Sequence, residues 1–192
     1  MKNSKIICVL LVLIAIVIIP LQASAFEYGE NDFVIDYIPG DIDGNNQVTA
    51  ADARLCIRAA ASLETLTAEQ IKIADIDGDG VITSANARNI LRASAKIAPL
   101  DVTVTAKAGQ RVVVGPYRDS GVYMWDYTTD SDNTVVDRTY ENNLPEDYIG
   151  AFDQFCAIAS QEKESFTVKF TKSVPWTGEM YFSFNLTINF VQ

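Results

Sequence analysis

A segment of this chain occurs twice, with a spacing of 34 residues. Residues 41–64 read DIDGNNQVTAADARLCIRAAASLE, and residues 75–97 read DIDGDGVITSANARNILRASAKI. A fixed period of this length indicates a duplicated supersecondary unit. Each copy has an Asp- and Gly-rich turn followed by apolar residues at helical spacing, which predicts a loop and a helix, twice.

The repeated turns have the oxygen spacing of a twelve-residue calcium loop, in which positions 1, 3, 5, 7, 9 and 12 supply the six to eight ligands of the ion. The first loop offers Asp41, Asp43, Asn45, the Gln47 carbonyl, Thr49 (directly or through water) and Asp52. The second offers Asp75, Asp77, Asp79, the Val81 carbonyl, Thr83 and Asn86.

We predict that these loops bind two calcium ions. Position 6 requires a positive φ, which Gly80 adopts freely and Asn46 tolerates. The second loop is expected to bind less tightly, because Asn86 has no carboxylate. The alternative is a pair of Asp-rich turns that bind nothing, since Asp, Asn and Gly are ordinary turn residues. The doubled match favours calcium.

After residue 25, the chain divides into a short lead at 26–38, the repeats at 39–97 and a C-terminal region at 100–192. Between the repeats, the pattern from Thr67 to Gln70 predicts a capped connecting helix. From residue 100 onward, apolar residues alternate with polar ones, which predicts half-buried antiparallel strands in a sandwich or barrel. The predicted fold is multidomain, with an all-α module followed by an all-β sandwich or barrel.

The first 25 residues have the features of a secretory signal. Two lysines precede an apolar run that ends at Pro20, and the small residues 23–25 follow it. The run is shorter than the roughly 20 residues that cross a bilayer, so cleavage after Ala25 is favoured over a membrane anchor. We expect a protein secreted to an extracellular or cell-surface assembly, without a membrane span after cleavage.

Composition excludes several classes of function. The net charge is −10, which makes nucleic acid an improbable partner. The chain has no histidine, so histidine-activated nucleophiles and histidine metal ligands are absent. Cys56 and Cys156 lie far apart in sequence and are interpreted as buried small hydrophobes rather than a disulfide framework. We therefore predict a protein that is not an enzyme.

The two loop-helix halves, GDIDGNNQVTAADARLCIRAA and ADIDGDGVITSANARNILRAS, resemble the dockerin module of cellulosomal and related bacterial assemblies. The resemblance covers residues 39–97 and implies calcium-dependent docking onto a cohesin of a scaffold protein. The family's recognition positions would fall in one half on Ala50, Ala51, Ile57 and Arg58. In the other half they would fall on Ser84, Ala85, Leu91 and Arg92.

The order of segments in 100–192, ending in KSVPWTG before a terminal strand, resembles the chagasin-type inhibitors of papain-like cysteine proteases. This resemblance implies an immunoglobulin-like sandwich that presents three loops to the protease. The first loop would fall on Tyr117, Arg118, Asp119, Ser120, Gly121 and Val122. The second would fall on Gly150, Ala151, Phe152 and Asp153, and the third on Val174, Pro175 and Trp176.

Two other interpretations of the C-terminal region remain open. It could be a non-catalytic module that binds carbohydrate or protein through Trp176, Tyr117 and Tyr123. It could also be a small enzyme, although no carboxylate pair stands out from the general acidity. Trp125 is expected to lie in the core of a strand. Trp176 lies between two strands and next to turn-forming residues, where we expect a large aromatic side chain to be exposed and to contact a binding partner.

Overall fold

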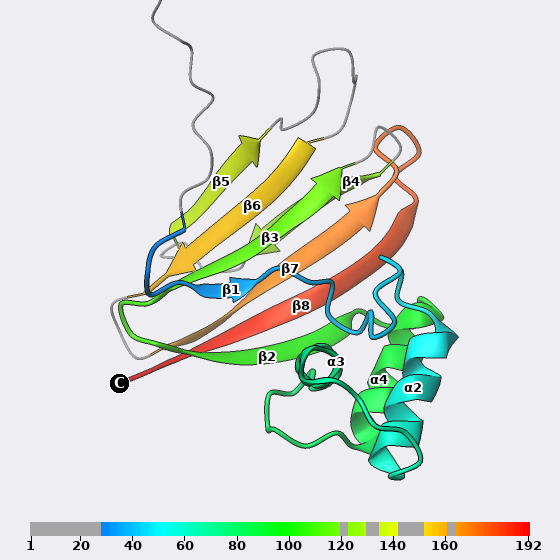
Figure 1. The fold of residues 1–192 in the computed structure, drawn as a ribbon. Helices are drawn as coiled ribbons and strands as arrows, with labels where there is room; N and C mark the ends of the chain where they lie inside the picture. The colour runs from blue at the N-terminus through cyan, green and yellow to red at the C-terminus, as the bar shows by residue number, and fades with distance from the viewer. Residues whose placement is uncertain (1–27, 120–122, 130–134, 142–151, 161–163) are drawn as a thin grey trace, which may run out of the picture.

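The computed structural model describes residues 28–119, 123–129, 135–141, 152–160 and 164–192, which form a helical module beside a β domain (Figure 1). The predicted signal lies outside these residues, among which no helix is long and apolar enough to cross a membrane. The elements are β1 (Phe33–Ile35), α2 (Ala50–Ala60), α3 (Ala68–Ala74), α4 (Ser84–Ser94), β2 (Leu100–Lys107), β3 (Arg111–Asp119), β4 (Met124–Thr129), β5 (Val135–Glu141), β6 (Phe152–Ala159), β7 (Ser165–Ser173) and β8 (Met180–Val191).

Each of the three helices in the described residues begins after a threonine N-cap, and each start is a capping box. Before α3, the Thr67 amide donates to Gln70 Oε1 at 3.0 Å, and the Gln70 amide donates to Thr67 Oγ1 at 3.2 Å. The connecting helix predicted from this pattern is thus present. The two repeat helices, α2 and α4, are capped in the same way by Thr49 and Thr83.

Helices α2 and α4 are in contact with each other. Their buried apolar residues are Ala53 and Cys56 on α2 and Ala87, Ile90 and Ala93 on α4, and Cys56 has no exposed surface. Burial raises the pKa of the Cys56 thiol to about 11, so it is not a reactive thiolate at neutral pH. The prediction of a buried small hydrophobe holds for Cys56, whereas the side chain of Cys156, on β6, lies outside the description.

The β domain consists of two four-stranded sheets, in the orders β1-β3-β6-β5 and β2-β8-β7-β4. The alternation predicted from residue 100 is visible in β2, where Leu100, Val102, Val104 and Ala106 are buried and the residues between them are not. Buried residues of both sheets belong to one hydrophobic cluster, which holds the two layers together.

The expectation of antiparallel pairing from residue 100 onward is wrong for β2, which pairs with β8 in parallel. Strand β1, which lies before that region, also pairs in parallel, with β3, while the other four pairings are antiparallel. The alternation of apolar residues indicates which face of a strand is buried but not its direction. Neither parallel pair is joined by a tight hairpin, so no turn in the sequence fixes its direction.

The N-terminal lead joins the β domain. Phe33–Ile35 pairs with Val112–Val114, and the helical module lies in the chain between β1 and β2. Beside this pairing, Asp32 accepts hydrogen bonds from Arg111: the Nε atom lies 3.0 Å from Oδ1, and Nη2 lies 2.6 Å from Oδ2. The helical module is therefore attached to the β domain at both of its ends.

We predict that Asp32→Asn weakens the anchorage of the lead. The hydrogen bond from Arg111 holds the pKa of Asp32 below its ordinary value of 3.8, so the stabilisation is present above that pH and is lost as pH falls through the lower folded-state value. The variant should lose about 1–3 kcal/mol of unfolding free energy at pH 7. Urea unfolding should show that the difference in unfolding free energy between the variant and wild type shrinks towards pH 2.

Asp36→Asn is the control, because Asp36 lies 4.0 Å from Lys72 in an exposed pair expected to contribute under about 1 kcal/mol. An equal loss in both variants would contradict the prediction.

Candidate functional site: two acidic loops, a helical groove and the end of the β domain

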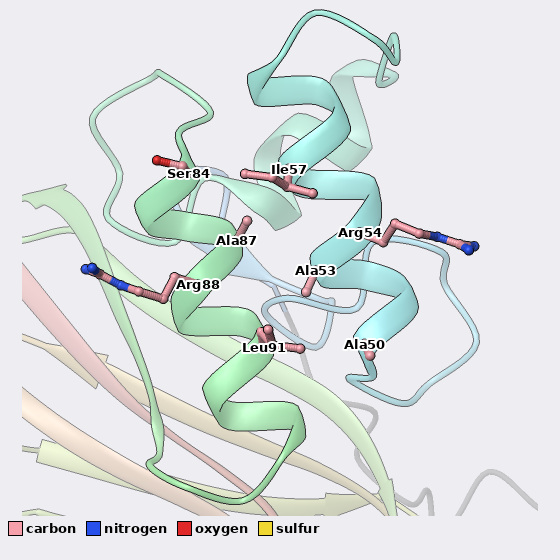
Figure 2. A pocket seen from close by; sticks show the side chains of 8 residues that line it. All are labelled: Ala50, Ala53, Arg54, Ile57, Ser84, Ala87, Arg88 and Leu91. Carbon is pink, nitrogen blue, oxygen red and sulfur yellow. The ribbon is translucent and has the colours of Figure 1, made fainter.

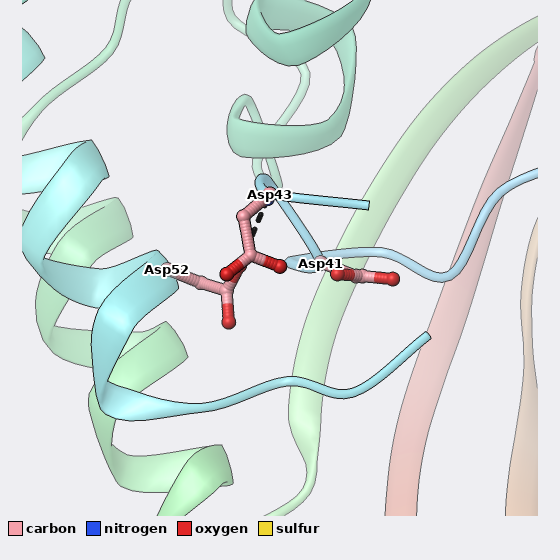
Figure 3. A group of neighbouring side chains, drawn as sticks. All are labelled: Asp41, Asp43 and Asp52. Carbon is pink, nitrogen blue, oxygen red and sulfur yellow. Dashed lines mark hydrogen bonds between the residues drawn. The ribbon is translucent and has the colours of Figure 1, made fainter. Parts of the chain in front are cut away.

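The first acidic loop gathers three carboxylates. Ligand atoms of Asp41, Asp43 and Asp52 lie within 4.8 Å of one another (Figure 3). Asp41 is held in place by the backbone, because Asn45 and Asn46 donate their amides to its two oxygens at 3.1 and 2.7 Å. Asp52 is fully buried and accepts the Asp43 amide at 3.1 Å. The loop thus directs carboxylate oxygens from both of its ends toward one point.

The second loop repeats this geometry with one difference. Asp79 and Gly80 donate their amides to Asp75 at 3.2 and 2.9 Å, as in the first loop, and Asp75, Asp77 and Asp79 form the acidic group. At position 12, the Asn86 amide nitrogen donates to Asp77 Oδ1 at 2.9 Å. Here Asn86 presents a donor where the first loop presents a carboxylate, which is consistent with unequal sites.

The donor set of both loops fits a hard cation. Burial raises the pKa of Asp41, and the neighbouring Asp52 and Asp43 charges add to this effect. Burial also raises the pKa of Asp75, with a contribution from Asp77. Clustered carboxylates of this kind are costly without a positive charge. The positive φ expected at position 6 is present, 66° at Asn46 and 83° at Gly80.

The residue at position 12 of each loop also caps a helix, which the ligand pattern did not reveal. The Thr49 amide donates to Asp52 Oδ2 at 2.7 Å, and the Thr83 amide donates to Asn86 Oδ1 at 2.7 Å. Each position-12 residue therefore also fixes the start of its helix. Asn in the second loop keeps this capping role while it lacks the charge.

A groove runs between α2 and α4. It is lined by Ala50, Ala53, Arg54, Ile57, Ser84, Ala87, Arg88 and Leu91. Figure 2 shows Ile57 and Leu91 between the helices and the two arginines extending to opposite sides. Ile57 and Leu91 are 42% and 48% exposed. They occupy equivalent positions in the two repeats, so the apolar surface is duplicated along with the loops.

The predicted docking residues are partly gathered by this groove. Ala50, Ile57, Ser84 and Leu91 line it, whereas Ala51, Arg58, Ala85 and Arg92 do not. Arg58 instead pairs with Glu64, with Nε 3.2 Å from Oε2. The sequence interpretation missed Ala53, Ala87, Arg54 and Arg88, although Arg54 and Arg88 are themselves repeated 34 residues apart. That recurrence was the available signal.

One end of the β domain collects the segments expected to form the three loops. Asp119 at the end of β3 pairs with Phe152 at the start of β6. Met124 at the start of β4 pairs with Ser173 at the end of β7, and Ser173 pairs with Met180. The chain therefore leaves β3, enters β4 and β6, and turns from β7 to β8 at the same end.

The turn between β7 and β8 displays Trp176. The Val174 amide donates to the Glu179 carbonyl at 2.9 Å, and the Gly178 amide donates to the Val174 carbonyl at 2.8 Å. Trp176 is 66% exposed. Met124 and Met180, which both pair with Ser173 at the end of β7, are 46% and 42% exposed. Trp125, in contrast, is 3% exposed and packs edge-on to Phe184 in the core, as expected.

The other two expected loops need correction. Tyr117, Arg118 and Asp119 lie in β3, and Phe152 and Asp153 lie in β6, so these residues pair as strands. The sequence PYRD was misleading because Pro116 lies at an irregularity in the β3–β6 register, where a strand tolerates proline. Ser120, Gly121, Val122, Gly150 and Ala151 lie outside the described residues.

The family model of the dockerin type I domain matches residues 39–92, and these residues are a dockerin type I domain. Among curated proteins, none matches the sequence.

Several solved structures are similar to this chain at low identity. The cysteine protease inhibitor EhICP2 from Entamoeba histolytica is 16% identical, with 46% of this chain and 84% of that chain covered and a TM-score of 0.36. Amebosin is 14% identical, with 47% and 89% covered and a TM-score of 0.37. PbICP-C, solved in complex with falcipain-2, is 10% identical, with 47% and 86% covered and a TM-score of 0.32.

Proposed function

We propose that this protein is a secreted, non-catalytic component of a scaffold assembly, which docks on a cohesin through its helical module in the presence of calcium. The observation that carries the proposal is the duplicated acidic loop and helix, with an exposed apolar residue at the same place on each helix. The dockerin family match over the same residues implies a cohesin as the partner. The signal-like segment at 1–25 supports export.

Calcium would be held by the six predicted oxygens of each loop, two ions in all. Its chemical contribution is charge neutralisation: it allows three clustered carboxylates to remain ionised and close together. The chain does the rest, since the backbone amides orient Asp41 and Asp75, and the position-12 residues connect each loop to its helix. Each ion would thereby hold its loop against the start of the helix that follows it.

The docking surface would be the groove between α2 and α4, with Ile57 and Leu91 as its apolar contacts. Because the two are equivalent in the repeats, a half-turn of the module presents nearly the same surface to a partner. The test is capture of the full chain on a panel of immobilised type I cohesins in calcium. Saturable binding to at least one cohesin supports the proposal, whereas absence of binding across the panel by a calcium-loaded chain overturns it.

We further propose that the β domain is an immunoglobulin-like inhibitor of papain-like cysteine proteases. Such a protease binds extended peptide in a long groove, so a blocker needs rigid loops at one end of a sandwich. Support comes from the VPWTG turn, which resembles the chagasin-type motif. It also comes from the exposure of Trp176 at the end of the β domain where β3 ends and β4 and β6 begin.

For this second function we predict that Trp176→Ala weakens inhibition by about 30-fold, because a large exposed aromatic on a fixed turn would be the anchor of the contact. The measurement is a titration of the full chain against a panel of papain-like proteases. Leu63→Ala, which truncates a residue 67% exposed on the helical module, should leave inhibition unchanged.

Cleavage of the chain or indifference across the panel would contradict inhibition. Retention on insoluble polysaccharide, lost in Trp176→Ala, would instead assign the domain to the binding-module alternative.

A further inference from the structure

We propose that the edge of β2 completes the second calcium loop, and that calcium at this loop stabilises the β domain in return. The inference rests on the calcium binding proposed above. Strand β2 lies outside the loop-helix repeats. Its backbone contact with only one of the two loops makes the repeats unequal in a way that their ligand residues do not explain.

The contact is a backbone one. Ile76, at position 2 of the second loop between Asp75 and Asp77, accepts a hydrogen bond through its carbonyl from the Thr103 amide at 2.8 Å. Strand β2 lies at the edge of its sheet, so the second loop adds to the open side of that strand. Ile76 and Leu100 are buried in the same hydrophobic cluster.

Gly78, at position 4 of this loop, lies directly against β2. A Cβ atom at Gly78 would meet the Thr103 carbonyl oxygen at 2.6 Å, which no side chain can occupy without a shift of backbone. Glycine here serves a close approach between the loop and β2, in addition to its φ of 68°.

The first loop has a different arrangement at both equivalent positions. The Ile42 carbonyl accepts from Gln70 Nε2 at 3.2 Å, so its partner belongs to α3 in the helical module. Gly44 has a similar φ of 72°, but nothing lies within 4 Å of the Cβ that it lacks. A peripheral contact joins the first loop to β8, where Tyr181 donates its hydroxyl to Gln47 Oε1 at 2.8 Å. The first loop is thus held mainly by its own module, and the second by the β domain.

The physical consequence is thermodynamic linkage. If β2 holds the second loop in the geometry that gathers Asp75, Asp77 and Asp79, an intact β domain raises the calcium affinity of that loop. Calcium must then stabilise the β domain by the same factor. The weaker ligand set of the second loop makes this support more important there than in the first.

The experiment uses the full chain with Trp176→Phe, which leaves the buried Trp125 as the single tryptophan and a reporter of the β domain alone. Calcium should raise the melting temperature seen by Trp125 fluorescence by about 4 °C or more. Gly78→Ala should remove at least half of this shift. Gly44→Ala is the matched control, because it introduces a similar backbone strain but its Cβ atom would meet no other atom within 4 Å. This variant should show the same calcium-dependent rise in melting temperature as the parent chain.

A second measurement needs no loop variant. Hydrogen exchange at the Thr103 amide should slow about tenfold or more when calcium is added. The inference is overturned if calcium raises helical ellipticity or protects the loop amides while Trp125 melting and Thr103 exchange stay unchanged, or if the two glycine variants respond alike. If calcium changes none of these signals, calcium binding itself fails, and the proposed docking function fails with it.

Discussion

Replacing Ile57 and Leu91 together by Asp is expected to reduce cohesin binding by more than about 100-fold. Each side chain is about half exposed in the groove between α2 and α4, and a bound partner is expected to bury mainly Ile57 in one orientation of the module and mainly Leu91 in the other. With a carboxylate at both places, either orientation buries a charge without a partner and loses an apolar contact.

The single variants Ile57→Asp and Leu91→Asp should each cost far less than the double variant. With one repeat damaged, a half-turn of the module still presents the other, since the two positions are equivalent. Affinity is measured by surface plasmon resonance of the full chain on a cohesin that captures wild type.

Leu63 and Ile97 provide the matched control pair. They are also related by the repeat and are 67% and 68% exposed, but they lie outside the groove. The double variant Leu63→Asp with Ile97→Asp should bind nearly as well as wild type. Equal losses in the two double variants would contradict the assignment of the groove, and equal losses in the single and double groove variants would contradict interchangeable docking.

Calcium is expected to bind in two unequal events and to stabilise the helical module by several kcal/mol at saturating concentration. Three carboxylates per loop repel one another without the ion, and no basic residue occurs in residues 41–52 or 75–86. Calorimetric titration of calcium into the full chain should resolve the two events, and ellipticity at 222 nm should melt at higher temperature with calcium than with chelator.

The loop responsible for the weaker event is identified by two variants. Asn86→Asp supplies the missing carboxylate and should tighten the weaker event by about tenfold. Asp52→Asn makes the reciprocal change in the first loop, keeps the capping oxygen, and should weaken the stronger event. If Asn86→Asp tightens the stronger event or neither, the assignment of the weaker site to the second loop is wrong.

The helical module could be predicted from sequence in detail because the repeat gives each signal twice. The three helices, the cap of α3 at Thr67 and the positive φ of Asn46 follow from short-range chemistry, which residue types report directly. Groove residues Arg54 and Arg88 recur with the same period as Arg58 and Arg92, so recurrence alone did not distinguish the arginines that line the groove from those that do not.

The β domain was predictable only in part. Alternation identified which residues of β2 and β8 are buried, but strand direction depends on partners more than 70 residues away in sequence. The three residues of β1 carry too little pattern to indicate a strand, and they pair with β3 beyond the whole helical module. Gly44 and Gly78 are equivalent in sequence, and only tertiary structure reveals that one of them approaches another backbone.

The most direct test of calcium-dependent docking is the affinity of the full chain for one captured cohesin, measured across a series of free calcium concentrations. We predict an affinity that falls at least 100-fold between saturating calcium and chelator, and that recovers when calcium is restored. An affinity that stays constant while calorimetry shows the loops emptying would contradict the account.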